Sequence, residues 1–197
     1  MAAAKQGNRV VFDVAQPERF GRAGVPLRFF ILLLFFIPGS INWLASLVYL
    51  PIMTAVLVRE EGAEEFLAED AKRVADLLRW IVGIYAYFAF LTDHLSFDDP
   101  HESIRFEIHP DGRPTPRSAL ARIAKSIPNV IVFAVVGIGA LGVWLVANVL
   151  ILATGNYPRP LYAYQRAVNR WQARLFSYHT SLVDEYPPFR LDTGRAS

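Results

Sequence analysis

Two long stretches of this chain carry no charged side chain, and each of them is preceded by a short segment rich in alternating apolar and charged residues. The uncharged stretches cover residues 29–58 and 126–158. At about 1.5 Å per helical residue, roughly 20 apolar residues cross the hydrocarbon core of a bilayer. Both stretches are longer than that, so the pattern predicts two long helices embedded in a membrane.

Proline and glycine divide these stretches. Pro38 and Gly39 predict a bend in the first, which is either one long helix or two shorter ones that dip in and return. In the second, small residues would allow another helix to approach closely. They are Gly137, Gly139, Ala140 and Gly142. The alternative is a glycine-containing helix that faces lipid.

A second and more polar helix is predicted after each apolar stretch. Residues 77–92 are apolar except for Arg79, whereas residues 162–183 carry Arg166, Arg170 and Arg174 at a spacing of four, which places them on one stripe of a helix. Such a stripe suits either an interfacial helix or a spanning helix whose arginines face protein. We favour four membrane-embedded helices over two spanning and two interfacial ones.

Short strands are expected at residues 9–14 and 104–108, where β-branched and aromatic residues gather and a proline soon follows. A lone strand would leave its backbone hydrogen bonds unmade. We therefore expect the two strands to pair with each other outside the membrane.

The same order of elements occurs twice along the chain, and specific residues recur with it. A shift of 91 positions aligns Arg79 with Arg170, Tyr87 with Tyr178 and Asp93 with Asp184. A shift of 90 aligns Ile37-Pro38 with Ile127-Pro128, and a shift of 94 aligns Phe12 with Phe106 and Arg28 with Arg122. The self-similarity predicts two tandem units, residues 1–98 and 99–197. With two helices per unit, the fold class expected is an all-α membrane protein of two parallel helical-hairpin repeats with short extramembrane β-strands.

Composition agrees with a membrane protein and narrows the chemistry. Hydrophobic residues make up 53% of the chain and charged residues 19%, and the net charge of +2 is too small to indicate nucleic-acid binding. The absence of cysteine excludes disulfides and thiolate chemistry. No phosphate-binding glycine loop or nucleophile elbow is found, so we expect no enzyme and no catalytic, cofactor-binding or metal-binding residue.

Basic residues in the connections predict the orientation. The segment before the first uncharged stretch and the segment before the second each carry five basic residues. This excess would place both termini on the cytoplasmic side of the plasma membrane. The basic residues are Lys5, Arg9, Arg19, Arg22 and Arg28, and Arg105, Arg113, Arg117, Arg122 and Lys125.

Three pieces near the end of the chain carry a resemblance to a known family. They are Thr154-Gly155-Asn156-Tyr157-Pro158-Arg159, Arg170-Trp171 and Asp184-Glu185-Tyr186-Pro187-Pro188-Phe189. In this order they resemble the bacterial membrane family known as domain of unknown function 4389, here as a tandem duplication. The resemblance implies a membrane location and a repeated unit, but no activity and no functional residue. The first unit departs from the pattern, with Glu60-Glu61-Gly62-Ala63 where the tyrosine-proline turn would fall.

Two groups of polar residues are candidates for a site. His94, His101 and His109 lie among acidic residues, but their spacing matches no metal motif, and His179 is expected to be a hydrogen-bonded packing residue. Arg79 and Arg170 could each pair with the aspartate of the other unit, Asp184 and Asp93. The alternative is that both aspartates simply end their helices in water.

Two functions remain open. The leading hypothesis is a non-catalytic accessory or scaffold subunit that packs against other membrane proteins or against itself, with membrane lipids around it. The alternative is a small transporter or lipid-handling protein in which Arg79, Arg170 and Arg174 meet an anionic group between the two units.

Overall fold

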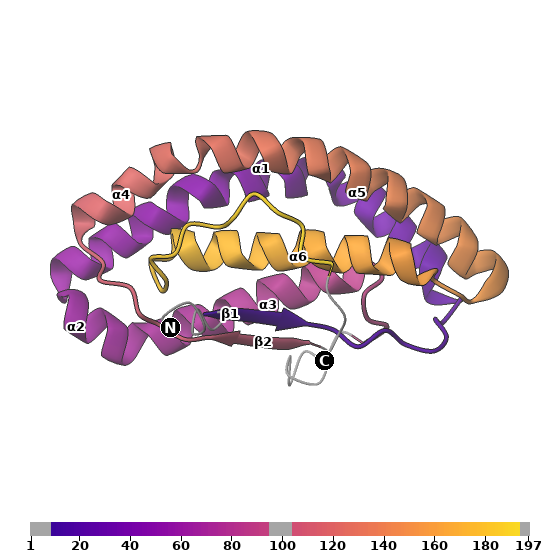
Figure 1. Cartoon of the computed structure of the whole chain (residues 1–197), viewed down its shortest axis with the longest axis horizontal. Coiled ribbons are helices and arrows are strands. Elements are labelled where there is room, and N and C mark those ends of the chain that lie inside the picture. Colours follow the sequence, from indigo (N-terminus) through magenta and orange to yellow (C-terminus); the bar gives the residue numbers. More distant parts are fainter. Residues whose placement is uncertain (1–8, 95–103, 194–197) are drawn as a thin grey trace, which may run out of the picture.

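A computed structural model describes residues 9–94 and 104–193, which form six α-helices and one two-stranded sheet. The helices are α1 (Gly24–Glu60), α2 (Ala63–Glu65), α3 (Ala71–Phe88), α4 (Pro116–Lys125), α5 (Ile127–Thr154) and α6 (Arg159–His179), with a π-helical turn over Phe66–Asp70. Figure 1 shows three layers: α1 with α4 and α5, then α3 with α6, then the sheet. The long helices all run roughly parallel to the long axis of the molecule (Figure 1).

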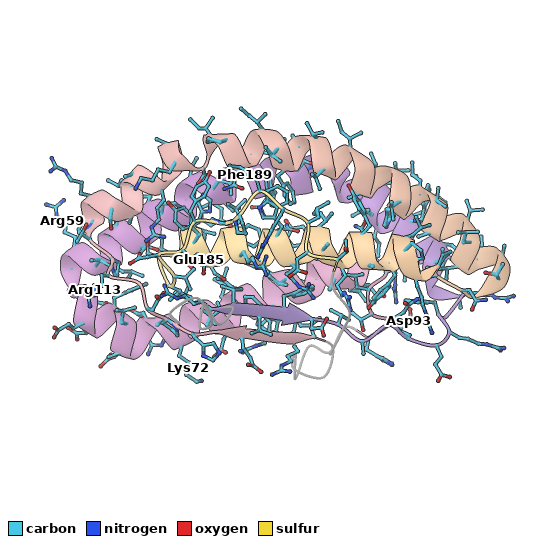
Figure 2. The ribbon with its side chains drawn as sticks, in the orientation of Figure 1. Arg59, Lys72, Asp93, Arg113, Glu185 and Phe189 are labelled. Carbon is cyan, nitrogen blue, oxygen red and sulfur yellow. The ribbon has the colours of Figure 1, made fainter. Side chains whose placement is uncertain are left out.

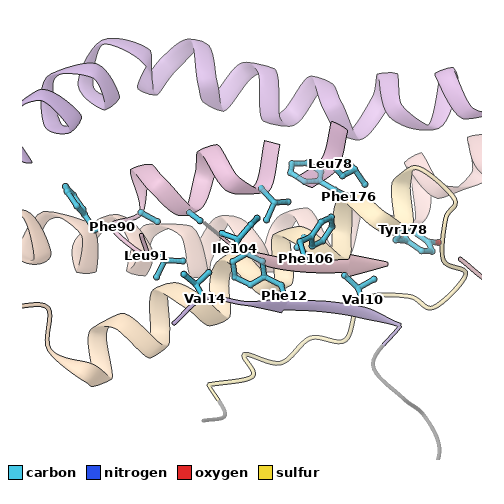
Figure 3. Packing of buried hydrophobic residues seen from close by; sticks show 14 of the residues in the cluster. Val10, Phe12, Val14, Leu78, Phe90, Leu91, Ile104, Phe106, Phe176 and Tyr178 are labelled. Carbon is cyan, nitrogen blue, oxygen red and sulfur yellow. The ribbon is translucent and has the colours of Figure 1, made fainter. Parts of the chain in front are cut away.

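The sheet confirms the expected pairing of the two short strands. β1 (Val10–Asp13) is antiparallel to β2 (Arg105–Ile108), and Phe12 lies directly opposite Phe106. Both phenylalanines are buried and turn toward α3 and α6, where they pack beside Leu78 (Figure 3). The two predicted units therefore share one sheet and one core, and their boundary at residue 98 stays a prediction.

The first uncharged stretch is one helix, α1, which continues through Pro38 and Pro51. It runs antiparallel to α4 and α5, because Trp43 stacks on Phe133 (4.8 Å between ring centroids) and Phe29 stacks on Trp144 (5.6 Å). The second stretch begins at Ser126, which separates the charged helix α4 from the apolar helix α5. Helix α4 begins with a capping box in which Thr115 accepts from the Ser118 N–H (3.1 Å) and Ser118 accepts from the Thr115 N–H (2.9 Å), and α5 ends at Gly155, whose φ of +73° is left-handed.

The second helices of the two units differ from the expectation of four membrane-embedded helices. Among the described residues, two segments are long and apolar enough to cross a membrane, Pro38–Glu60 and Ile127–Thr154. Helices α3 and α6 are too polar, and α6 lies at the centre of the protein with 15 of its 21 residues buried. Its arginine stripe faces protein, because α3, α5, the sheet and the C-terminal segment surround it.

Only one of the α5 glycines makes a close contact. A Cβ on Gly139 would lie 2.5 Å from the Tyr164 hydroxyl of α6, which donates to the Val136 carbonyl (3.0 Å). Gly137 and Gly142 would meet nothing within 4 Å. The close approach is therefore confirmed at Gly139 alone, and the other two glycines lie on the open side of α5.

The outer faces of α1 and α5 form an extended apolar surface. Most of the large hydrophobic side chains that are exposed come from these two helices, and Ile138 is 74% exposed. Only 39% of the apolar window in Pro38–Glu60, and 17% of that in Ile127–Thr154, is buried within the protein. The core helices of a soluble domain are mostly buried, whereas these two windows are mostly exposed. We call the exposed side of α1 and α5 the apolar face.

Candidate functional site

A buried arginine near the start of α1 ties it to the end of α3. The Arg28 guanidinium donates to the Thr92 carbonyl (3.1 Å) and to the carbonyl and Oδ1 of Asp93 (3.1 and 3.0 Å). It also lies 3.8 Å from the centroid of the Tyr87 ring, and only 4% of the residue is exposed. The contacts satisfy carbonyl groups of the turn that follows α3 and stack the guanidinium on an aromatic ring of its last turn.

A second arginine repeats this arrangement at the end of α6. Arg122 in α4 donates to the carbonyls of Tyr178 (2.7 Å) and Val183 (2.8 Å) and to Asp184 Oδ1 (2.5 Å), and it lies 4.4 Å from the centroid of the Tyr178 ring. Arg122 is also 4% exposed. We call the two arrangements the arginine clamps, the first centred on Arg28 and the second on Arg122.

The clamps match in further detail. Asp93 Oδ2 accepts from the Gly21 N–H (2.8 Å), and Asp184 Oδ2 accepts from the Arg113 N–H (3.0 Å). Beside them, Phe90 and Ser181 both have a positive φ, 57° and 58°. Each aspartate therefore fixes the chain just before a helix, α1 or α4, while its other oxygen holds the arginine of that helix.

The clamps correct the sequence hypothesis about the aspartates. Asp93 and Asp184 pair with Arg28 and Arg122, not with Arg170 and Arg79. The aspartates lie beyond the ends of α3 and α6, beside the first turns of α1 and α4, whereas Arg79 and Arg170 lie in mid-helix. The recurrence of Arg28 as Arg122 was the signal in the sequence from which the true partners could have been found.

Arg79 and Arg170 instead bind the sheet, each through the strand of the other predicted unit. Arg170 Nε donates to the Phe12 carbonyl in β1 (2.9 Å), and Arg79 Nε donates to the Phe106 carbonyl in β2 (3.3 Å). Arg79 also pairs with Asp76. The two arginines thus connect the middle layer, α3 and α6, to the sheet through hydrogen bonds.

The arginine stripe of α6 is engaged by two acidic residues. Arg166 and Arg170 contact Asp13 Oδ1 at 3.3 and 3.4 Å, and Arg170 and Arg174 contact Asp192 Oδ2 at 3.5 and 3.6 Å. Asp192 ends a C-terminal segment, residues 184–193, that crosses α6. The stripe is therefore an internal ion-pair network and not an open anion site.

A serine and a histidine form a buried pair between α4 and α6. Ser126 Oγ is 2.6 Å from His179 Nε2, and His179 Nδ1 is 2.7 Å from the Leu175 carbonyl. Nδ1 must donate to that carbonyl, so in the neutral ring Nε2 is an acceptor. The Ser126 hydroxyl, which has one proton, lies 2.6 Å both from Nε2 and from the Arg122 carbonyl. Burial lowers the pKa of His179 to about 4, which keeps the ring neutral.

This pair has the residue types of a nucleophile and its base, but no substrate can reach it. Ser126 is 1% exposed and His179 is fully buried, and neither lines a cavity described below. The expectation that His179 is a hydrogen-bonded packing residue is confirmed.

The histidine-rich connection is only partly described. His101 and the acidic residues at 98, 99 and 102 lie outside the described residues. Among residues 9–94 and 104–193, no group of three or more histidine, aspartate or glutamate side chains could hold a metal ion. The expectation of no metal site stays a prediction.

Two depressions lie on the polar side of the molecule. One, of about 40 Å³, lies between β1, α6 and the C-terminal segment and is lined by Arg9, Arg174, Glu185 and Arg190. The other is a shallow opening of about 710 Å³ between α3 and β2, with Asp76, Arg79 and Glu107 at its wall. The first is too small for a lipid or a drug-sized solute, and the second is open to solvent.

Comparison with known families finds one match. Residues 116–190 match the model of the family described as "Domain of unknown function (DUF4389)". The matched segment runs from the start of α4 into the C-terminal segment and contains the second arginine clamp and the Ser126–His179 pair. One copy is matched, and the match does not extend to the first half of the chain. No curated protein and no solved structure matches the chain.

Proposed function

We propose that this protein is a non-catalytic membrane protein that uses its apolar face to enter the bilayer and its polar layers to serve other membrane proteins as an accessory or scaffold subunit. The observation that carries the proposal is the apolar face itself. A helix that is hydrophobic all round and yet exposed needs an apolar environment outside the protein. Lipid supplies that environment.

The polar residues favour a structural over a catalytic role. The arginine clamps, the stripe of α6 and the Ser126–His179 pair are all buried or bound to protein groups. Such networks give a small membrane protein a single rigid shape, which suits a docking subunit.

The alternative, a transporter or lipid-handling protein with a site at Arg79, Arg170 and Arg174, has less support. The three guanidinium groups are held by carbonyl and carboxylate oxygens of the protein, and the one depression that includes Arg174 has room for about one water-sized group. A lipid phosphate would have to displace Asp192 first.

We also infer that the chain arose by tandem duplication. The residues of the two clamps recur at shifts of 91 and 94, and Phe12 pairs across the sheet with its own counterpart, Phe106. Trp43 likewise stacks on Phe133 at a shift of 90. Counterparts that face each other are what a two-fold relation between two copies would produce. In this reading α1 corresponds to α4 and α5 together.

The proposal of a membrane accessory subunit is tested by extraction. Tagged protein should remain with membranes washed in alkaline carbonate, and mild detergent should release it together with another membrane protein in fixed stoichiometry. Recovery in the carbonate supernatant would contradict the membrane location. Recovery as a lone protomer with one tightly bound lipid species would favour lipid handling instead.

A further inference from the structure

We infer that α1 and α5 do not cross the membrane but lie flat in one leaflet. Both ends of the apolar face then lie on the same side of the bilayer, and the sheet lies in water on that side. The inference rests on the proposed membrane location and concerns how the apolar face meets the lipid. It makes the partner of that face the acyl layer of a single leaflet.

The level of the sheet along the long axis favours a flat arrangement. The Phe12 carbonyl of β1 binds Arg170 of α6 (2.9 Å), and the neighbouring Trp171 packs against Phe133 of α5 (6.0 Å between centroids). Phe133 stacks in turn on Trp43, which lies halfway along α1. The sheet is therefore level with the middle of the apolar helices, as Figure 1 also shows.

A crossing arrangement would bring this sheet to the centre of the bilayer. The side chains of Arg105 and Glu107 in β2 are 64% and 45% exposed and point away from the core. They would face lipid at mid-depth, as would the open edges of a two-stranded sheet, whose backbone groups have no partners in hydrocarbon. Both features are disfavoured inside a bilayer and ordinary in water.

A flat arrangement removes this conflict. A helix is about 10 Å in diameter and one leaflet supplies about 15 Å of hydrocarbon, so α1 and α5 fit within one leaflet side by side at any stagger. The charged sheet then lies two layers away, in water. Figure 2 shows Lys72 and Asp93 on that sheet side of the molecule, away from the arch of α5.

Charge at the two ends of the apolar face suits a headgroup layer. Exposed charged side chains are present at both ends, and basic residues are in excess at one of them. They are Arg19, Arg22 and Arg159 beside Glu18 at that end, and Arg59, Arg117 and Lys125 beside Glu60, Glu61, Glu64 and Glu65 at the other. In a flat arrangement both ends meet the headgroups of the same leaflet, whereas in a crossing arrangement they would meet opposite leaflets.

The chain contains no cysteine, so single cysteines can report sidedness directly. The variants are Ala23→Cys and Arg59→Cys at the two ends of α1, Arg105→Cys on the sheet and Ala134→Cys on the apolar face, all at exposed positions. Each is reconstituted into sealed vesicles and treated with a membrane-impermeant thiol reagent from outside, then again after the vesicles are opened.

The flat arrangement predicts that the cysteines at 23, 59 and 105 are labelled from the same side and that the one at 134 is protected before and after opening. Labelling of 23 and 59 from opposite sides, with 105 protected, would overturn the inference while leaving the membrane location intact. Labelling of all four from outside, with the protein eluting from the vesicles, would instead overturn the proposed membrane location itself.

Discussion

Arg122 shows at the scale of one residue why the polar groups of this protein are structural. Its guanidinium donates to two buried carbonyls, that of Tyr178 in the last turn of α6 and that of Val183 beyond the end of α6. Asp184 is 45% exposed, so screening by water weakens the ion pair, and the carbonyl contacts are the larger part of the interaction.

Replacing Arg122 should therefore destabilise the fold strongly. We expect Arg122→Met to lower the free energy of unfolding by about 2–3 kcal/mol, because two buried carbonyls lose their donors. Arg122→Lys should restore only part of the loss, since an ammonium cannot reproduce the planar fork of a guanidinium.

Denaturant titration in detergent measures the free energy of unfolding of both variants. The control is Arg117→Met on the same helix, an exposed position, which should change stability by less than about 0.5 kcal/mol. Equal effects of the two methionine variants would contradict the clamp.

His179 makes stability depend on pH in a defined direction. Its folded pKa of about 4 lies below the usual value near 6.5, so the unfolded chain binds the proton more readily. The contribution of neutral His179 to the free energy of unfolding is complete above about pH 6.5. It is lost as the pH falls toward 4, by roughly 3 kcal/mol in total. Unfolding measured between pH 7 and pH 4 should show this decline. His179→Gln should flatten the decline in stability, whereas the control His109→Gln, at an exposed position, should leave it unchanged. A decline that persists in His179→Gln would contradict its assignment to His179.

Residue types were easier to identify in the sequence than their partners. The repeat marked Arg28, Arg122, Asp93 and Asp184, but spacing along one helix gave no way to see that each aspartate lies beyond its helix end and beside the start of an earlier helix, α1 or α4. Ser126 gave no signal at all, because its contact with His179 joins residues 53 positions apart.

At the scale of elements, the apolar helices and the strands followed from the sequence, and the role of the polar helices did not. Period and composition were enough for α1, α5 and the β1–β2 pair. Helix α6 was predicted to be membrane-embedded, with an interfacial helix as the alternative. Its arginines instead have partners in β1 and the C-terminal segment that only the tertiary arrangement supplies.

The contact between α5 and α6 gives an element-scale prediction. Gly139→Ala should be destabilising by about 1–2 kcal/mol, because the new Cβ would lie 2.5 Å from the Tyr164 hydroxyl and displace it from the Val136 carbonyl. Gly137→Ala, two residues away with open space around it, should stabilise the helix by about 0.5–1 kcal/mol. Thermal unfolding of the two variants in one detergent makes the comparison. The same sign of change in both would show that α6 does not approach α5 at Gly139.

At the scale of the whole molecule, the apolar face and the charged sheet lie on opposite sides of the middle layer (Figure 1). This separation gives the whole molecule one apolar side and one polar side, although neither α1 nor α5 is itself an amphipathic helix. A hydropathy pattern along the chain cannot reveal it, because crossing and flat helices of this length have the same composition.

A single charge on the apolar face should weaken membrane association without unfolding the protein. Ile138→Glu replaces a side chain that is 74% exposed, and we expect it to cost about 3 kcal/mol of membrane affinity, or roughly 100-fold in partitioning. The released fraction after carbonate washing should rise accordingly. The control is Phe189→Glu, 53% exposed on the C-terminal segment, which should release no additional protein. Equal release by both variants would place the membrane contact elsewhere.

The most direct test of the flat arrangement is polarised infrared spectroscopy of the protein in aligned bilayers. Because α1, α3, α5 and α6 all run roughly along one axis, the dichroism of the helical amide band reports a single orientation (Figure 1). The account predicts an average helix axis close to the plane of the membrane. An axis close to the membrane normal would contradict it and return α1 and α5 to the role of spanning helices.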